Sequence, residues 1–297
     1  MAKLREALEK LIPSDKAKLM YNSYDIIGDV ALVKMPHELD QYEETVGEAF
    51  HEAHTSLKAV FRVVGETEEN ERTRELKLIW SRRSPRSGRE IDNADLSRTV
   101  YSEYGCMFIV DVRKVFFTPR LSNERMRIAK QVRAREVVAC LFGGVCTYAI
   151  IMAKVCPEVG RIYSVDINPT AYQLGSENVL INKCADKVTS ILGDARAICE
   201  EQLKGACSRV IMPLPTQAIL FLDSAVEALR EGPKRVINFY SEVSGVDIKE
   251  EATKVINETN RNLRDYGAKR SETTGWRIVR EVGPRRYHIA IDFLVSK

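Results

Sequence analysis

The chain has 297 residues, of which 44% are hydrophobic and 29% are charged, and its formal net charge at pH 7 is only +3. This composition predicts a soluble globular protein with a real core, and the length predicts two domains or one domain with an appendage. No apolar run approaches the roughly 18 residues that a membrane span needs, and the charged segment 1–10 is unlike a signal peptide, so we expect a cytoplasmic protein without a membrane segment.

Residues 1–99 predict a small α+β domain that begins with a short helical extension, residues 1–20. A Gly28–Asp29 turn interrupts the first strand, and Pro36 stands where helices often begin. Residues 81–93 are polar and rich in Arg, Ser and Gly, which indicates a loop. The expected elements are helices at 1–20 and 36–54 and strands at 25–34, 56–64 and 74–80.

Residues 100–297 alternate between strand-like and helix-like segments, which predicts a doubly wound parallel sheet. The two last strands, joined at Gly283–Pro284, suggest an antiparallel addition to that sheet. We therefore expect an α/β fold, a Rossmann-like class I methyltransferase domain, behind the smaller N-terminal domain. The expected strands are 106–117, 137–142, 161–166, 188–192, 209–212, 235–240, 276–282 and 287–294, and the helices 122–135, 148–155, 170–182, 197–203, 217–229 and 249–266.

The seven cysteines are scattered and form no CxxC pair. This pattern favours neither a zinc site nor a disulfide framework, so we expect no metal and mostly buried thiols. Positive charge is concentrated between residues 111 and 135, a segment that contains eight Lys or Arg residues and only two acidic residues. Such a run is either a solvated surface or a contact to phosphates, and beside a nucleoside-binding domain it favours a nucleic-acid partner.

Two carboxylates follow successive strands of the expected parallel sheet. Asp166 ends the strand at 161–166, where an acid can accept both ribose hydroxyl hydrogens of an adenosine. Asp194 follows the next strand, where an acid can accept from the adenine amino group. Each can instead serve as a helix cap or turn residue, although Asn168 and Pro169 already suit the cap after Asp166.

Other features of the same edge narrow the choice of cofactor. The Gly143–Gly144 pair lets the backbone approach a ligand closely, but the chain has no GxGxxG fingerprint and no phosphate-binding lysine behind it. A ribose and an adenine without phosphates indicate S-adenosyl-L-methionine. Pro213 and Pro215 fix a rigid, extended backbone after the fourth strand, which suits a base held edge-on, or simply ends that strand.

Several segments of the sequence resemble a known family, the archaeal and eukaryotic tRNA (guanine-N1)-methyltransferases that modify the guanosine 3′ to the anticodon. The similarity covers nearly the whole chain from about residue 20. The matching segments are 24–31, 116–129, 166–169, 193–196, 209–215 and 284–288.

The resemblance implies an enzyme that transfers a methyl group from S-adenosyl-L-methionine to N1 of guanosine 37 in tRNA, here acting as a monomer. It implies Glu124 as the general base, and residues 1–99 as the RNA-binding or substrate domain. An arginine beside guanine O6 would stabilise the charge that develops there, and Arg120 is our candidate. The cofactor contacts it implies are Arg125, Asp166, Ile167, Asp194, Ala195 and Pro213.

Three departures from the family pattern leave alternatives open. Cys140 stands for an acid and Cys146 for a glycine in the loop after the first strand, Pro213 stands for an asparagine, and residues 101–105 differ from the usual "HREHG". One alternative is an aminocarboxypropyl transferase of the wybutosine pathway, against which Asp166 and Pro215 argue. The other is a catalytically silent tRNA-binding homologue.

Overall fold

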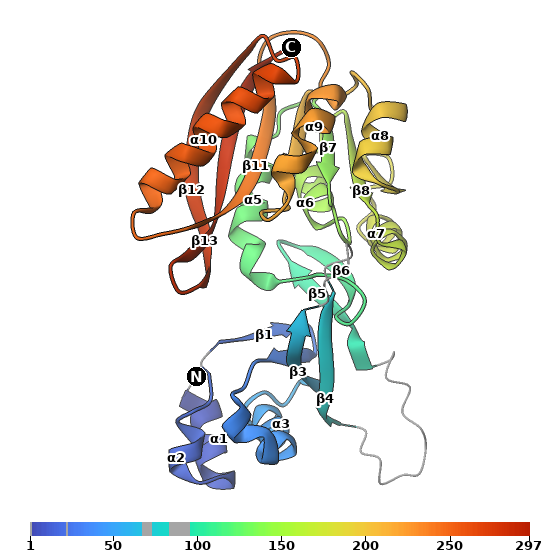
Figure 1. Cartoon of the computed structure of the whole chain (residues 1–297). Coiled ribbons are helices and arrows are strands. Elements are labelled where there is room, and N and C mark those ends of the chain that lie inside the picture. The colour runs from blue at the N-terminus through green and yellow to red at the C-terminus, as the bar shows by residue number, and fades with distance from the viewer. Residues whose placement is uncertain (1, 22, 67–72, 83–95) are drawn as a thin grey trace. The chain divides into compact units, whose positions relative to one another are not determined.

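The computed structural model describes residues 2–21, 23–66, 73–82 and 96–297. It comprises two compact units, Met1–Pro119 and Arg120–Lys297, both drawn in Figure 1. The domain boundary expected between residues 99 and 100 falls inside strand β5 (Arg98–Glu103) of the first unit. Most of the expected polar loop, residues 83–93, lies outside the described residues.

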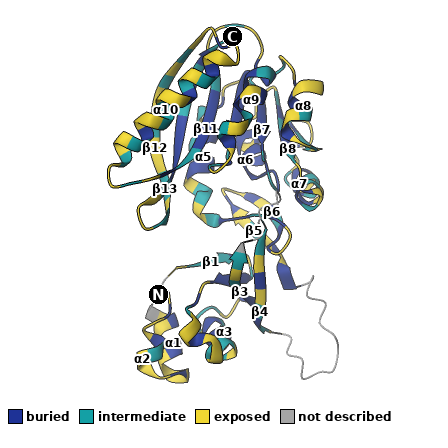
Figure 2. Cartoon of the chain, viewed as in Figure 1, coloured by how far each residue is buried: buried dark blue, intermediate teal, exposed yellow. Residues whose placement is uncertain are grey.

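The first unit contains a four-stranded sheet of order β1-β2-β3-β4 and a separate hairpin of β5 and β6. Only the β2–β3 pair of that sheet is parallel. Buried residues of α1, α3 and strands β2 to β4 form its core, visible as dark stripes in Figure 2. The elements are α1 (Ala2–Leu11), α2 (Ser14–Ala17), β1 (Tyr24–Ile27), β2 (Val30–Val33), η1 (His37–Tyr42), α3 (Glu43–Ala53), β3 (Ala59–Glu66), β4 (Arg74–Ser81), β5 (Arg98–Glu103) and β6 (Cys106–Asp111).

Three expected elements of this unit differ from the structure. The helix expected at 1–20, with Ile12–Pro13 closing its first part, is two helices, α1 and α2, that Pro13 separates because it cannot donate an amide hydrogen bond. The strand expected at 25–34 is divided at its expected Gly28–Asp29 turn into the antiparallel strands β1 and β2, and the φ of Gly28, +58°, is left-handed. The strand expected at 106–117 ends at Asp111 and pairs with β5, a half-polar strand that the sequence pattern did not reveal.

The second unit is a seven-stranded sheet of order β12-β13-β11-β10-β7-β8-β9, preceded by the turn η3 (Pro119–Leu121). Strands β7 to β11 are parallel, and β13 is antiparallel to both β11 and β12. The expected α/β fold with an antiparallel addition is therefore confirmed. Its elements are α5 (Ser122–Gln131), β7 (Val137–Leu141), α6 (Thr147–Val155), β8 (Arg161–Asp166), α7 (Pro169–Ile181), β9 (Val188–Leu192), α8 (Ala195–Glu201), β10 (Arg209–Met212), η4 (Ala218–Phe221), α9 (Leu222–Ala228), β11 (Arg235–Ser244), α10 (Ile248–Asp265), β12 (Arg270–Gly283) and β13 (Arg286–Ser296).

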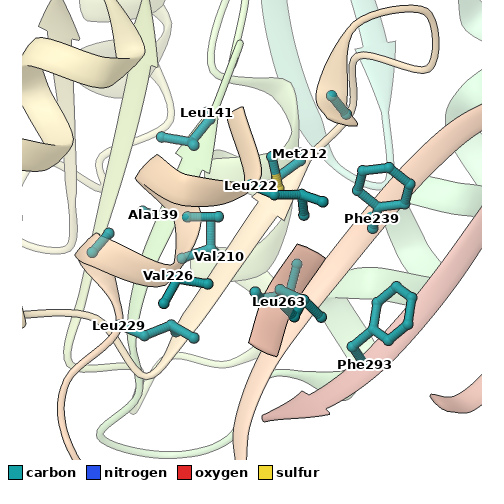
Figure 3. Close-up of a cluster of buried hydrophobic side chains, with 14 of the residues drawn as sticks. Ala139, Leu141, Val210, Met212, Leu222, Val226, Leu229, Phe239, Leu263 and Phe293 are labelled. Atoms are coloured by element: carbon teal, nitrogen blue, oxygen red, sulfur yellow. The ribbon is translucent and has the colours of Figure 1, made fainter. Parts of the chain in front are cut away.

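Helices cover both faces of this sheet, as a doubly wound fold requires. Helices α8, α9 and α10 lie on one face and α5, α6 and α7 on the other (Figure 1). Under the first layer, side chains such as Leu141, Met212, Phe239 and Phe293 are almost fully buried (Figure 3). Among the described residues, no helix is both long and apolar enough to cross a bilayer.

Two glycines of the first unit allow the energetic cost of backbone strain to be measured apart from the cost of a steric clash. Gly28 and Gly105 both have left-handed φ, but a Cβ on Gly28 would lie 2.3 Å from the carbonyl oxygen of Val100, whereas nothing lies within 4 Å of a Cβ on Gly105. We expect Gly105→Ala to lower the free energy of unfolding by about 1 kcal/mol, the cost of that conformation for an L-residue. Gly28→Ala should lose about 1–3 kcal/mol more because of the clash. Urea unfolding of the two variants measures the difference, and equal losses would contradict the clash.

Candidate functional site

The loop that joins β7 to α6 is tied to the end of the neighbouring strand β8. Phe142, Gly144 and Cys146 all have left-handed φ, between +55° and +65°. The Gly143 amide donates to the carbonyl of Val165 at 2.9 Å. A Cβ on Gly143 would lie 2.1 Å from Ser164 Oγ, so this position has room only for glycine. The loop therefore presents its backbone along the carboxyl edge of the parallel sheet.

Asp166, at the end of β8, receives two backbone hydrogen bonds. Its Oδ2 accepts from the Gly144 amide at 2.7 Å, and its Oδ1 accepts from the Asn168 amide at 3.0 Å. Both bonds come from backbone amides, so they fix the orientation of the carboxylate. Asn168, not Asp166, caps helix α7, because its side chain accepts from the Thr170 and Ala171 amides. The oriented, half-buried carboxylate of Asp166 fits the two hydroxyl groups of a ribose.

Asp194 and its neighbours complete this edge. Asp194 caps α8, where its Oδ1 accepts from the Arg196 amide at 2.8 Å, so it has the structural role that the sequence left open. The side chains of Ile167 and Leu192 are each 44% exposed at the ends of adjacent strands. Such apolar groups beside polar caps suit a flat apolar ligand such as adenine. Ala195, the first residue of α8, is buried.

The two cysteines that depart from the family pattern are wholly buried. Cys140 lies within β7 and Cys146 immediately before α6, and neither side chain has any exposed surface. Burial raises the pKa of both thiols, with Asp166 contributing, so both stay protonated at neutral pH. Neither thiol is therefore accessible from the surface of the loop. Pro213, half-buried after β10, offers neither an N–H nor a side-chain amide there.

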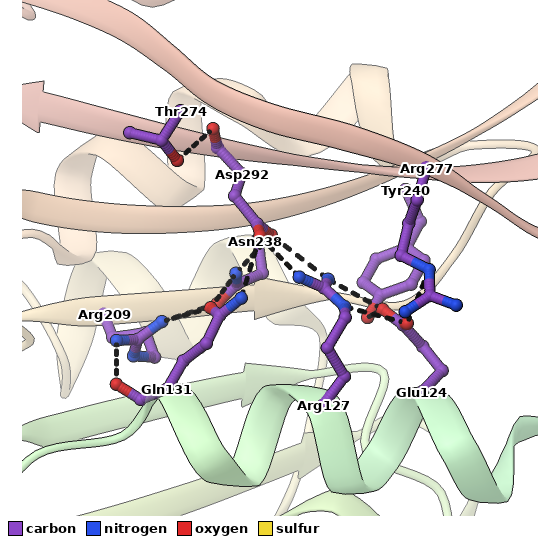
Figure 4. Close-up of polar contacts among 9 residues, drawn as sticks. All are labelled: Glu124, Arg127, Gln131, Arg209, Asn238, Tyr240, Thr274, Arg277 and Asp292. Atoms are coloured by element: carbon purple, nitrogen blue, oxygen red, sulfur yellow. Dashed lines mark hydrogen bonds and ion pairs between the residues drawn. The ribbon is translucent and has the colours of Figure 1, made fainter.

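Glu124, in the first turn of α5, is the centre of a buried polar cluster (Figure 4). Its side chain is only 3% exposed. Arg127 donates to it twice, from Nη2 to Oε1 at 2.8 Å and from Nε to Oε2 at 2.9 Å. The hydroxyl of Tyr240 donates to Oε1 at 2.6 Å, and Nε of Arg277 lies 4.0 Å from Oε2. The carboxylate is therefore held in one orientation by groups from α5, β11 and β12.

The same arginine joins Glu124 to a second buried carboxylate, Asp292 of β13. Burial disfavours the charge of Arg127, but its bonds to both carboxylates outweigh this and raise its pKa. Burial also opposes the charge of Asp292, yet Arg127, Asn238 and Gln131 hold the pKa of that carboxyl below its ordinary value. The network continues from Asn238 and Gln131 to Arg209, which pairs with Glu136.

The structure groups only some of the expected site residues. Glu124 and the buried Arg125 lie on α5, and Asp166, Ile167, Asp194 and Ala195 line the ends of β8 and β9. Arg120 is exposed in the turn η3 and, among the described residues, makes no ion pair with Glu124. Instead, Arg127 and Arg277 are the arginines that contact Glu124. The sequence reading missed both, although Arg127 stands three residues after Glu124, a spacing at which helical side chains meet.

Comparison with known proteins agrees with this geometry. Residues 99–267 match the TRM5/TYW2 methyltransferase domain, and residues 4–83 match the TYW2 N-terminal domain. The tRNA (guanine(37)-N(1))-methyltransferase Trm5b of Pyrococcus abyssi is 34% identical over 96% of this chain and 78% of its own length. The chain belongs to the TRM5/TYW2 methyltransferase family. The expected family resemblance and fold class are confirmed.

Other members of the TRM5/TYW2 family differ in the reaction that they catalyse. The tRNA(Phe) (4-demethylwyosine(37)-C(7)) aminocarboxypropyltransferase of Methanocaldococcus jannaschii is 29% identical over 91% of this chain and 96% of its own length. A complex of aTrm5 with tRNALeu superimposes with a TM-score of 0.80, at 30% identity, over 99% of this chain and 78% of that one. M. jannaschii Trm5 in complex with adenosine gives 0.74, at 31% identity and the same coverage.

Asp292 should make the stability of this family member depend on acidity. Its pKa is lowered in the folded state, so its contribution is complete above about pH 4, the ordinary aspartate range, and is lost as the pH falls through the folded-state value. We expect Asp292→Asn to lose roughly 3 kcal/mol at pH 7, because Arg127 loses a buried partner. The gap to the unsubstituted protein should narrow toward pH 3 in urea unfolding. The control is Asp186→Asn, an exposed site; a gap that widens in acid would contradict the assignment.

Replacing Cys146 with glycine should compensate for a larger side chain at the neighbouring position 175. A Cβ on Gly175, in α7, would lie 2.7 Å from Cys146 Sγ. We expect Gly175→Ala alone to lower the free energy of unfolding by about 1–3 kcal/mol through overpacking. Adding Cys146→Gly removes the thiol and the strain of a left-handed non-glycine residue, so the double variant should regain most of that loss. Additive losses in a thermal-unfolding cycle would show that the two positions are not in contact.

Proposed function

We propose that this chain transfers a methyl group from S-adenosyl-L-methionine to N1 of guanosine 37 in tRNA, with Glu124 as the general base. The observation that carries the proposal is a buried carboxylate held by Arg127 and Tyr240 on the same parallel-sheet domain that offers Asp166 to a ribose. The 34% identity to a Trm5b of that activity supports the same reaction. Residues 1–99, most of which match an N-terminal domain of the family, would contribute to binding the tRNA.

Guanine N1 requires a base because it carries a proton and has no free lone pair. A carboxylate oxygen within hydrogen-bond distance can take that proton. N1 would then gain the methyl group, while the proton passes to Glu124 and the cofactor sulfur keeps the electron pair of its broken bond. Arg127 and Tyr240 fix the orientation of Glu124, so little reorganisation of the carboxylate is needed when the guanine reaches it.

S-adenosyl-L-methionine supplies the electrophilic methyl group when bound. Asp166 would accept hydrogen bonds from its ribose hydroxyls, and Ile167 and Leu192 would pack against its adenine. Asp194 is exposed, and its Oδ2, which accepts no hydrogen bond from the described residues, would accept from the adenine amino group. Arg125 and Pro213 remain proposed neighbours of the cofactor.

A second candidate is aminocarboxypropyl transfer to a modified guanosine of tRNA. It is favoured by the match of residues 4–83 to the TYW2 N-terminal domain and by a relative of that activity, 96% of whose length this chain covers. In the third alternative, a silent homologue, neither transfer occurs.

The products distinguish these three reactions. The full chain is incubated with S-adenosyl-L-methionine and with a tRNA transcript bearing an unmodified guanosine 37, and the nucleosides are then identified by mass spectrometry. The proposal requires 1-methylguanosine at position 37. In parallel, tRNA carrying 4-demethylwyosine tests the aminocarboxypropyl reaction. Cofactor binding in calorimetry without any product in either reaction would support the silent homologue and overturn the proposal.

Replacing Glu124 should abolish methylation while sparing the cofactor. We expect Glu124→Gln to lower the single-turnover rate by about 10²-fold or more, since a positioned base contributes at least that much. Calorimetry should find the affinity for S-adenosyl-L-methionine unchanged. Glu136→Gln is the matched control, because it also removes a carboxylate paired with an arginine of the network but lies away from Glu124. A Glu124→Gln enzyme with an unchanged rate would remove Glu124 from the mechanism.

A further inference from the structure

Arg196, the second residue of α8, is held against the segment that follows β10. Its guanidinium carbon lies 4.5 Å from the centre of the Phe221 ring. Nη2 donates to the carbonyl oxygen of Leu220 at 2.6 Å, and Nη1 lies 3.2 Å from a carboxylate oxygen of Asp223. The stack, the hydrogen bond and the ion pair together fix the orientation of the guanidinium.

The guanidinium of Arg196 keeps an open face in spite of these contacts. The side chain is 48% exposed, although the Phe221 ring covers one side of it. Phe221 in turn packs edge-on against Phe142 in the loop after β7, with the ring centres 4.9 Å apart. Leu220, whose carbonyl holds the arginine, is 59% exposed. A planar cation backed by two aromatic rings is therefore presented to solvent.

This surface, the Arg196 platform (Arg196, Leu220 and Phe221), lies at the carboxyl edge of the parallel sheet. Helix α8 follows β9, and η4, which ends at Phe221, follows β10 three residues after Pro215. Asp166 stands at the end of β8, on the same edge. The platform and the proposed site of methyl transfer therefore share one edge of the sheet.

We propose that the Arg196 platform binds, by stacking, the base of a nucleotide next to guanosine 37. This rests on the proposed function, in which tRNA is the substrate. N1 lies on the pairing edge of guanine, and enzymes that modify a base commonly take it out of its stack. The neighbouring base then loses a stacking partner. An arginine plane is one of the surfaces on which proteins stack the unpaired bases of RNA.

The charges around Arg196 fit a base better than a phosphate. Asp223 pairs with the guanidinium, is itself 46% exposed, and would repel a phosphate group. Two nitrogens of the guanidinium already donate to Asp223 and to the Leu220 carbonyl, whereas its open face needs no further donor to stack on a ring. The adenine of the cofactor already has a proposed place beside Ile167 and Leu192. These arguments favour an RNA base as the ligand.

A thermodynamic cycle between the protein and tRNA tests the stack without requiring turnover. The full chain is titrated with tRNA transcripts bearing an unmodified guanosine 37, either intact or abasic at the nucleotide before or after it. We expect Arg196→Lys, which keeps the charge but loses the plane, to weaken binding of the intact tRNA by about tenfold, the effect of one base stack. At one of the two positions the abasic nucleotide should weaken binding to the unsubstituted protein by a similar factor. Combining that nucleotide with Arg196→Lys should weaken binding no further.

Controls separate stacking from other roles of Arg196. Arg133→Lys is the matched substitution, because Arg133 is an exposed arginine before β7, at the opposite edge of the sheet, and it should leave the tRNA affinity unchanged. If Arg196 only supports the η4 turn, Arg196→Lys weakens the intact and both abasic tRNAs by the same factor, which would overturn the inference. An unchanged affinity for intact tRNA would also overturn it. A lower affinity for S-adenosyl-L-methionine in calorimetry, with tRNA binding unchanged, would assign the platform to the adenine of the cofactor.

Because the cycle measures binding alone, it distinguishes the failure of this inference from the failure of the proposed function. If the full chain forms 1-methylguanosine but the cycle shows no coupling, only the platform is refuted. If the cycle shows coupling and no 1-methylguanosine forms, the proposed reaction fails and the platform stands. If the chain does not bind tRNA, both are refuted.

Discussion

The second unit depends on one partly buried cation, Arg127, that pairs with two carboxylates. Removing charges from water costs several kcal/mol per ion, and only complete pairing offsets that cost. Arg127 meets this condition because it donates to Glu124 on its own helix and to Asp292 on β13. The bridge therefore attaches helix α5 to the antiparallel strand that distinguishes this sheet from a purely parallel one. The last strand of the chain thus determines where the first helix of the domain places its acid.

The network follows the geometry of the helix and the register of the sheet together. Glu124, Arg127 and Gln131 stand at i, i+3 and i+7, the spacing of one helical face, so α5 turns a polar stripe toward the sheet where most helices turn an apolar one. Asn238 lies directly opposite Asp292 in the β11–β13 pair and donates to it. A shift of one residue in that pairing would point Asp292 to the other face and leave Arg127 with a single partner. Such polar matching specifies one register more sharply than apolar packing alone.

The order of strands and helices was predictable from the sequence, because the alternation of apolar runs fixes the class of sheet. The Asn168–Pro169 cap was equally local and equally predictable. Tyr240, Arg277 and Asp292 were not, since they reach Glu124 or Arg127 across more than a hundred residues and only through strand pairing. Cys146 shows the opposite error. The residue looked like the loss of a glycine, yet the backbone keeps the left-handed φ of +65° and the thiol is buried.

Helix α6 connects the loop after β7 with the polar cluster around Glu124. The loop ends at Cys146, and two residues later Tyr148 is buried beside Tyr240, with Glu124 and Arg125 nearby. The Tyr148 hydroxyl makes no hydrogen bond of ordinary geometry with any described residue. Burial chiefly raises the pKa of both tyrosines, so both remain neutral, and Tyr240 can donate to Glu124 without competing for its charge. Because the loop, Tyr148 and Glu124 belong to one packed layer, the fold sets the distance from Asp166 to Glu124 before any substrate arrives. That preorganisation is what a transfer between two bound groups requires.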